Sequence, residues 1–257
     1  MSPAGDSAET TSPDNAPELS IILPCYNEAE AIPYTFPQLA QAFEAAGHRL
    51  ELVGVDNGSS DETSARLHEL KDQGLPIVPV KVEVNQGYGF GLLSGIPHAR
   101  GKWVGFLPAD GQVDAEDVVR LFEALAPCGP DTMGKVRRRF RMDGPSRKVI
   151  SIVYNGLVWC LYPGLGSIDV NGTPKVVHRD TLAKMQLESR QWFLDPEILI
   201  KAYYMKLRVL EMNAFARMRG TGLSHVRAST CWEFFRQLLK FRFTGHLRSW
   251  KKSLRGS

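Results

Sequence analysis

The chain has 257 residues, of which 43% are hydrophobic and 23% charged, and its formal net charge at pH 7 is +3. This length allows one large hydrophobic core, and the apolar content excludes disorder over most of the chain. The small net charge excludes a strong field around the whole molecule, so any attraction to nucleic acid or anionic lipid must come from local clusters. Four cysteines without a C-x-x-C spacing indicate free thiols in a reducing compartment, and neither a disulfide framework nor a zinc site.

Residues 1–17 are rich in Ser, Pro, Ala, Asp and Glu, and we expect a disordered tail there, because few apolar side chains are available to offset the entropy of ordering. The start of the chain does not have the pattern of a signal peptide. No apolar stretch reaches the roughly 20 residues that cross a bilayer, and the nearest candidate, Val149 to Leu165, is interrupted by polar residues and Pro163. A soluble, cytoplasmic protein is therefore expected.

Short apolar runs alternate with helical patterns through the first half of the chain. The alternation predicts βαβ units, and hence an α/β fold with a mainly parallel sheet. Ligands of such sheets bind at the carboxyl ends of the strands, which directs attention to the loops after the predicted strands. Strands are predicted at Leu19–Leu23, Leu50–Val55, Ile77–Val84 and Trp103–Leu107, with helices at about 28–46 and 61–73.

Beyond Asp131 the pattern changes. A basic segment, Lys135 to Arg141, precedes an amphipathic stretch from Lys148 to Leu161, and mixed strand and helix signals continue to about Ala216. From Thr230 onward the chain is basic and aromatic and predicts a helix. Because no repeat or linker separates these parts, we expect one domain at 18–228, followed by a basic, aromatic helical segment at 229–257.

Polar residues gather in the loops at the predicted strand ends. The first loop carries Tyr26, whose ring can stack on a base, and the second carries Asp56, which can accept hydrogen bonds from a base or a ribose. In the second loop Gly58 permits a tight turn, while Asp61 fits a helix N-cap as well as a ligand contact. The third loop, residues 85–91, superficially suggests a dinucleotide site but lacks the G-x-G-x-x-G frame.

The fourth loop contains Asp110 and Gln112, which place a carboxylate and an amide oxygen two residues apart at the end of a strand. Both oxygens can reach one hard cation from the same side, and Mg²⁺ or Mn²⁺ held there would bridge a diphosphate. An Asp in such a loop is also often a helix cap, so this pattern by itself leaves both interpretations open.

Taken together, these loops resemble those of family-2 glycosyltransferases of the GT-A fold. The segment LSIILPCYNEAEAI is similar to the P-x-Y-N-E motif of that family, VDNGSSDET to its V-D-D-G-S-x-D-x-T motif, and NQGYGFGLLSGIPHARG to its Asn- and Gly-rich motif. FLPADGQVDAEDV resembles the strand end that carries D-x-D. Three later segments, DVNGTPKVVHRD, WFLDPEILIKA and RGTGLSHV, resemble the branch that includes polyprenyl-phosphate mannose and glucose synthases.

The resemblance covers roughly residues 18–245 and is specific for the family, though not for a substrate. It implies a Rossmann-like GT-A nucleotide-diphospho-sugar transferase fold and an inverting transfer of a hexose from a GDP- or UDP-sugar to a polyprenyl phosphate. It places Asp110 and Gln112 on a Mg²⁺ or Mn²⁺ ion that stabilises the leaving diphosphate. The residues implied to bind the nucleotide-sugar are Pro24, Tyr26, Glu28, Asp56, Asn57, Asn85, Gly87, Arg219 and Ser224.

On the acceptor side, the resemblance implies that three arginines and a serine face the lipid phosphate, because guanidinium groups bind phosphate oxygens bidentately. The same run also fits a solvated basic loop. A phosphate acceptor is already an anion and can attack without a general base. A hydroxyl acceptor would need one, for which Asp195 and Glu197 are the candidates. The acceptor residues are Arg138, Arg141, Arg147 and Ser151.

Two positions depart from the family motifs. Pro108 stands where the first Asp of D-x-D is usual, which weakens the expected metal site. Asn57 replaces the second Asp of D-D-G and changes the hydrogen bonds offered to a nucleoside. Two alternatives therefore stay open, namely transfer to a hydroxyl of a small molecule or glycan, and a catalytically silent domain that binds a nucleotide-sugar.

The C-terminal segment combines aromatic with basic side chains. It fits an interfacial helix that lies on an anionic membrane, or a helix that packs on the domain and buries its aromatics. No nucleic-acid-binding module accompanies the basic residues, so nucleic acid is not an expected partner. The expected location is cytoplasmic, with a peripheral contact at a membrane surface. The aromatic residues are Trp232, Phe234, Phe235, Phe241, Phe243 and Trp250.

Overall fold

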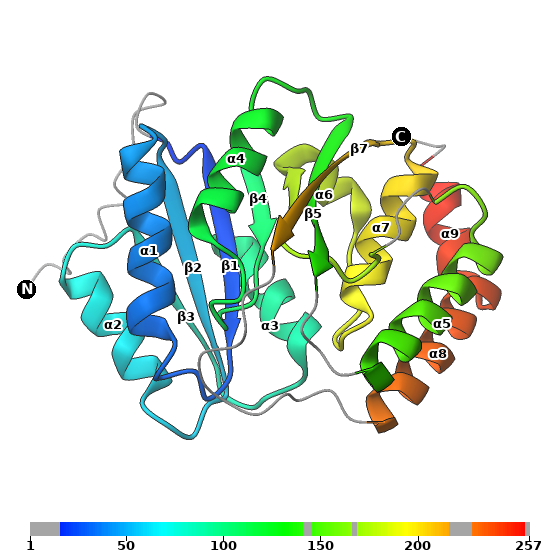
Figure 1. The fold of residues 1–257 in the computed structure, drawn as a ribbon, viewed down its shortest axis with the longest axis horizontal. Helices are drawn as coiled ribbons and strands as arrows, with labels where there is room; N and C mark the ends of the chain where they lie inside the picture. The colour runs from blue at the N-terminus through cyan, green and yellow to red at the C-terminus, as the bar shows by residue number, and fades with distance from the viewer. Residues whose placement is uncertain (1–15, 141–144, 166–168, 216–227, 255–257) are drawn as a thin grey trace, which may run out of the picture.

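A computed structural model describes residues 16–140, 145–165, 169–215 and 228–254 (Figure 1). Its centre is a seven-stranded sheet in the order β3-β2-β1-β4-β6-β5-β7. Strands β1 to β4 are mutually parallel, β6 runs antiparallel to β4 and β5, and β7 is parallel to β5. The strands are β1 (Leu19–Cys25), β2 (Leu50–Asn57), β3 (Ile77–Val82), β4 (Trp103–Phe106), β5 (Thr132–Phe140), β6 (Lys175–His178) and β7 (Arg208–Phe215).

Helices cover both faces of the sheet, as the α/β prediction requires. Figure 1 shows α5, α8 and α9 together at the end of the molecule opposite α2. No helix in the described ranges is long and apolar enough to cross a bilayer. The helices are α1 (Ile32–Ala45), α2 (Thr63–Asp72), α3 (Tyr88–Gly95), α4 (Ala115–Leu125), α5 (Pro145–Leu161), α6 (Arg179–Met185), α7 (Leu194–Tyr204), α8 (Ala228–Phe243) and α9 (Gly245–Ser253).

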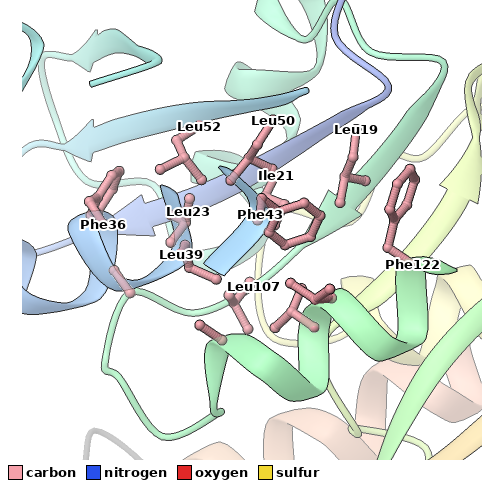
Figure 2. Close-up of a cluster of buried hydrophobic side chains, with 14 of the residues drawn as sticks. Leu19, Ile21, Leu23, Phe36, Leu39, Phe43, Leu50, Leu52, Leu107 and Phe122 are labelled. Atoms are coloured by element: carbon pink, nitrogen blue, oxygen red, sulfur yellow. The ribbon is translucent and has the colours of Figure 1, made fainter. Parts of the chain in front are cut away.

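Alternate residues of β1 serve two separate cores. Leu19, Ile21 and Leu23 point toward α1 and α4, where they meet aromatic rings such as Phe43 (Figure 2). Ile22 points to the opposite face and joins the core that α3, α7, α8 and α9 complete. Successive side chains of a strand alternate between faces, so a continuous apolar strand is stable only where both faces are covered.

The predicted strands are all present, with shifted ends. The second strand continues to Asn57, so Asp56 and Asn57 belong to β2 and not to the loop after it. The first helix begins only at Ile32, because residues 28–31 form a turn that precedes it. The basic segment from Lys135 is part of β5, where pairing with β6 and β7 satisfies its backbone.

The C-terminal segment forms two helices separated at Thr244, whose backbone is extended. Phe241 packs on Phe193 of the core, with 5.3 Å between ring centroids, and Trp250 is buried and donates its indole N–H to Lys184 O at 3.1 Å. These two aromatics therefore face the domain, which agrees with the second of the two interpretations given above, a helix that packs on the domain and buries its aromatics. Phe235 and Phe243 remain exposed.

Candidate active site

The carboxyl ends of the first four strands meet at one edge of the sheet, as the sequence predicts (Figure 1). Cys25 at the end of β1 pairs with Asp56 of β2, and Asn57 pairs with Val82 at the end of β3. The loops that follow these strands, and the loop after β4, therefore lie around the same edge.

The loops after β1 and β2 are tied together by hydrogen bonds. Asn27 donates its N–H to Ser59 Oγ at 3.1 Å and accepts from Ser60 N at 2.9 Å. Asp61 accepts from Ala29 N at 3.2 Å and from Thr63 N, at the start of α2, at 3.0 Å. Burial acts against ionisation of Asp61, but these hydrogen bonds lower its pKa below the usual value. Asp61 thus joins the loops after β1 and β2 just before α2, whose N-cap residue is Glu62, and Tyr26 is exposed on the first of these loops.

Three carboxylates, those of Glu28, Asp56 and Asp61, act on Cys25 at this edge of the sheet. Burial, followed by these charges, raises the pKa of the Cys25 thiol well above its usual value. Carboxylates that gather in this way favour a bound cation.

Asn57 is buried, with 2% of its surface exposed, and its amide nitrogen faces two oxygens. It donates to Gly87 O at 3.0 Å and lies 3.5 Å from Asn85 Oδ1. Its own Oδ1 has no hydrogen-bond partner among the described residues. A buried acceptor without a partner costs free energy, and a ligand N–H or O–H could relieve that cost. An aspartate at position 57 would place a second hydrogen-bond acceptor beside Gly87 O, with no donor between the two oxygens. An asparagine supplies that donor and therefore fits this position.

The glycine-rich loop after β3 packs against residues 188–192, of which only Trp192 belongs to a motif quoted above, WFLDPEILIKA. Phe90 donates its N–H to Arg190 O at 2.7 Å, and Gln191 Nε2 donates to Gln86 O at 3.1 Å. The rings of Tyr88 and Trp192 stack with centroids 4.5 Å apart. The only sequence signal for this contact is the WFLDPE motif, which begins at Trp192.

Gly89→Ala should separate these two segments. A Cβ at Gly89 would lie 2.3 Å from Ser189 O and 2.6 Å from Gln191 O, so the segment at 188–192 must move away. We expect a loss of roughly 1–3 kcal/mol in the free energy of unfolding, and faster proteolysis within 188–192. Gly245→Ala is the matched control, because a Cβ there meets nothing within 4 Å. Unchanged proteolysis of the Gly89 variant would contradict the close approach.

The side chain of Glu197 binds the backbone of the same segment, residues 188–192. Its fully buried carboxylate accepts from Ser189 N at 2.8 Å, from Glu188 N at 3.2 Å and from Lys201 Nζ at 2.6 Å. Lys201 also donates to Gln186 O at 2.8 Å. The geometry therefore gives Glu197 a positioning role, and a role as general base does not fit a carboxylate that is buried and engaged in this way.

Asp195, the other candidate base, is paired with a buried lysine. Lys175 Nζ donates to Asp195 Oδ1 at 2.6 Å. Lys175 lies on β6, opposite Phe106 at the end of β4 and opposite Lys135 on β5. Lys135 is also fully buried, and its Nζ donates to Asp169 O at 2.5 Å and to Glu211 Oε2 at 3.2 Å. A network of buried charges thus lies beside the strand end that carries Asp110.

The burial of Lys135 predicts that its own contribution to the stability of the protein rises as the pH increases from 8 to 10.5. Burial, followed by the charge of Lys175, lowers the pKa of Lys135 from 10.5 to about 8. Between these values the unfolded chain binds a proton that the folded chain has released. Lys135 therefore contributes up to about 3 kcal/mol more to the free energy of unfolding at pH 10.5 than at pH 8, whereas Cys25, whose thiol pKa is raised, acts in the opposite direction above about pH 9. Urea titrations should show that the difference in unfolding free energy between the wild type and Lys135→Met grows by this amount over the range, while the difference between the wild type and exposed Lys102→Met stays constant. Equal slopes in the wild type and the Lys135 variant would contradict it.

Asp110 and Gln112 lie in the loop after β4, and both side chains are half-buried. Asp110 Oδ1 accepts from Gln112 N at 3.2 Å, and Thr35 Oγ1 of α1 donates to Ala109 O at 3.2 Å. Asp110 does not cap α4, because that helix begins at Ala115 with Asp114 as its N-cap residue. The helix-cap interpretation of Asp110 is therefore excluded.

Asp110 and Gln112 offer few oxygen ligands, so they suit a cation that is bound mainly by waters and by the substrate. No group of three or more His, Cys, Asp or Glu side chains that could hold a metal occurs in the part of the chain that the structure describes. Mg²⁺ commonly binds through one or two carboxylates, waters and substrate phosphates. One carboxylate and one amide oxygen at an edge where carboxylates gather fit that pattern when a diphosphate supplies further oxygens.

The remaining predicted residues cannot be placed in the site. Arg141, Arg219 and Ser224 lie outside the described residues, as do the side chains of Arg138 on β5 and of Arg147 and Ser151 in α5. The predicted donor residues Pro24, Tyr26, Glu28, Asp56, Asn57, Asn85 and Gly87 all belong to the strand ends or loops at this edge.

Comparison with known proteins gives a family match over more than half of the chain. The model of glycosyl transferase family 2 matches residues 20–182. Undecaprenyl-phosphate 4-deoxy-4-formamido-L-arabinose transferase from Enterobacter sp. (strain 638) is 34% identical over 142 residues, which are 55% of this chain and 43% of that protein. The transferase of the same name from Klebsiella pneumoniae subsp. pneumoniae is 32% identical over 142 residues, with the same coverage of 55% and 43%. The match spans less than half the length of these relatives.

A solved structure shares the fold at low sequence identity. Glucosyl-3-phosphoglycerate synthase from Mycobacterium tuberculosis, in complex with Mn²⁺, uridine diphosphate and glucosyl-3-phosphoglycerate, superposes with a TM-score of 0.66. The two proteins are 18% identical, and the superposition covers 88% of this chain and 80% of that one. The fold of this chain is therefore the GT-A fold.

Proposed function

This chain belongs to glycosyl transferase family 2, and from that premise we propose that it transfers a hexose from a GDP- or UDP-sugar to a polyprenyl phosphate. The observation that carries the proposal is the convergence of Asn57, the loop at Gly87 and Asp110 at one sheet edge where carboxylates gather. The acceptor class is supported by the relatives, which are named for undecaprenyl phosphate.

In the proposed complex, Tyr26 stacks on the base, while Asp56 and the Oδ1 of Asn57, which accepts from no other described residue, accept hydrogen bonds from the nucleoside. Asp110 and Gln112 would hold a divalent cation, which is present as Mn²⁺ in the structural neighbour. Such a cation neutralises charge on the leaving diphosphate. Segment 188–192 closes the glycine-rich loop and keeps water from this side of the donor.

The transfer itself is a single displacement at the anomeric carbon. A phosphate oxygen of the acceptor forms the new C–O bond in line with, and opposite to, the bond that breaks, and the nucleoside diphosphate leaves with the bonding electrons. A phosphate dianion loses no proton in this step, so no general base is required. The engagement of Asp195 by Lys175 and of Glu197 by Lys201 supports a phosphate acceptor over a hydroxyl.

Release of nucleoside diphosphate from a panel of GDP- and UDP-sugars tests the proposal. The assay is run with and without undecaprenyl phosphate in detergent, in Mg²⁺, Mn²⁺ or EDTA. We expect release from one donor to be stimulated by the lipid and abolished by EDTA. Lipid-independent release that responds to a hydroxyl acceptor would overturn the acceptor class. Donor binding without release under any acceptor would show a silent domain.

Because a polyprenyl phosphate is anchored in a bilayer, we also propose that the chain works in peripheral contact with the cytoplasmic surface of a membrane.

A further inference from the structure

The outward face of α5 is apolar. Ile152, Val153 and Trp159 are exposed by 70%, 66% and 64%. Together with exposed Gly156 and Cys160, they follow the spacing i, i+1, i+4, i+7, i+8, which forms one stripe along a helix. The opposite side of the helix, at Val158, is buried in the core. We call these five exposed residues the α5 stripe. It contains no charged side chain.

The α5 stripe is part of a larger cluster. Eight large apolar side chains are exposed among the described residues, and five of them lie on α5 and α8, the last two being Phe235 and Phe243. The two helices pack against each other, and Arg242 of α8 donates its Nε–H to Leu161 O at the end of α5, at 3.2 Å (Figure 1). Single exposed apolar residues are ordinary, whereas a contiguous group indicates a contact surface.

Basic residues predominate around this cluster. Residues 228–257, which include α8 and α9, contain seven Lys or Arg and one acidic residue, Glu233, and residues 144–168 contain two basic residues and no acidic one. Arg236 and Lys240 of α8 are exposed, as are Arg248 and Lys252 of α9. A second copy of the chain docked on this cluster would bring like charges together, which is unfavourable, whereas an anionic surface complements them.

We propose that the α5 stripe, with Phe243 of α8, docks on an anionic lipid surface, with α5 lying along the plane of the interface. Trp159 and the aliphatic side chains enter the boundary between headgroups and acyl chains, and the basic residues of α8 and α9 contact anionic headgroups. This inference rests on the proposed function in one respect, because docking would bring the acceptor site to the bilayer that holds the polyprenyl phosphate. The test of docking requires no sugar transfer.

Co-sedimentation with vesicles tests the surface. The vesicles are phosphatidylcholine with or without phosphatidylglycerol, and the proteins are wild type, Trp159→Ser and the control Tyr34→Ser, whose side chain is 69% exposed on α1. We expect Trp159→Ser to lower the partition coefficient by roughly tenfold, and Tyr34→Ser to leave it unchanged. Lys240→Gln should weaken binding to vesicles that contain phosphatidylglycerol and leave binding to pure phosphatidylcholine vesicles unchanged. Added salt should have the same effect. Thermal unfolding of Trp159→Ser should match the wild type, because its side chain is exposed.

Three results would overturn the inference. They are wild-type protein that stays in the supernatant, Trp159→Ser that sediments like the wild type, or a wild-type dimer in light scattering that Trp159→Ser dissolves. Transfer to a short, detergent-soluble polyprenyl phosphate without vesicle binding would refute the lipid surface and leave the proposed function intact. Vesicle binding without transfer to any acceptor would refute the proposed function alone.

Discussion

Asp110→Asn should lower the rate of sugar transfer about 100- to 1,000-fold and change the free energy of unfolding by less than about 0.5 kcal/mol. The carboxylate lies at the end of β4 and supplies the negative charge of the proposed cation site. The hydrogen bond from Gln112 N to Asp110 Oδ1 can be kept by the amide oxygen of an asparagine, so the loop geometry survives the change. The expected loss of rate is therefore caused by the loss of negative charge at the site of the cation that binds the diphosphate.

Single-turnover release of nucleoside diphosphate, measured across a range of Mn²⁺ concentrations, is the appropriate assay. The variant should need more Mn²⁺ than the wild type to reach its own half-maximal rate. Asp114→Asn is the matched control, since Asp114 is an acidic residue of the same loop that serves as the N-cap residue of α4. A rate like that of the wild type in Asp110→Asn would remove this residue from the mechanism. An equal loss in both variants would attribute the effect to the loop.

Glu197→Ala should lower the free energy of unfolding by about 3–5 kcal/mol, because it leaves the buried Lys201 ammonium without its carboxylate. It also removes the acceptor of Ser189 N, so the segment that closes the glycine-rich loop loses its anchor. The double variant Glu197→Ala/Lys201→Met should recover part of the loss, because it removes the unpaired charge. Guanidinium titrations of the single and double variants measure both effects.

The exposed neighbour Glu188 supplies the control, since Glu188→Ala removes a carboxylate from the same segment without leaving a buried charge. Its unfolding free energy should stay within about 0.5 kcal/mol of the wild type. The stability measurement also separates a positioning residue from a base. If Glu197→Ala abolished transfer while unfolding like the wild type, Glu197 would act in the chemistry and the role assigned from its contacts would be wrong.

Asn57 departs from the family motif, and the hydrogen bond that its amide donates explains why an asparagine fits this position. The amide donates to Gly87 O, at the N-terminus of α3, and leaves its Oδ1 at the site without a partner among the described residues. The loops after β2 and β3 are therefore joined directly. The family's aspartate would need a donor at the position of Gly87 O.

The fold, and the sheet edge at which the predicted donor residues lie, followed from the sequence itself. Leu19–Cys25 and Leu50–Asn57 are apolar runs too short for helices, and helical patterns separate them from the next strands. Parallel strands end at one edge, so the sequence alone assigns Tyr26, Asp56 and Asp110 to the same edge of the sheet. Local patterns succeed here because strand order and handedness leave few topologies open.

Only the tertiary structure decided which charges are engaged and which helix faces are covered. The motif LDPE places Asp195 and Glu197 in sequence, but the lysine on β6 that binds Asp195 is 20 residues away, and no spacing rule connects them. Helical periodicity likewise identifies an apolar stripe without saying which side of the helix meets the core. Trp250 is buried and Trp159 exposed because burial depends on neighbouring elements, and among the described residues these elements pack against α9 and not against the outward face of α5.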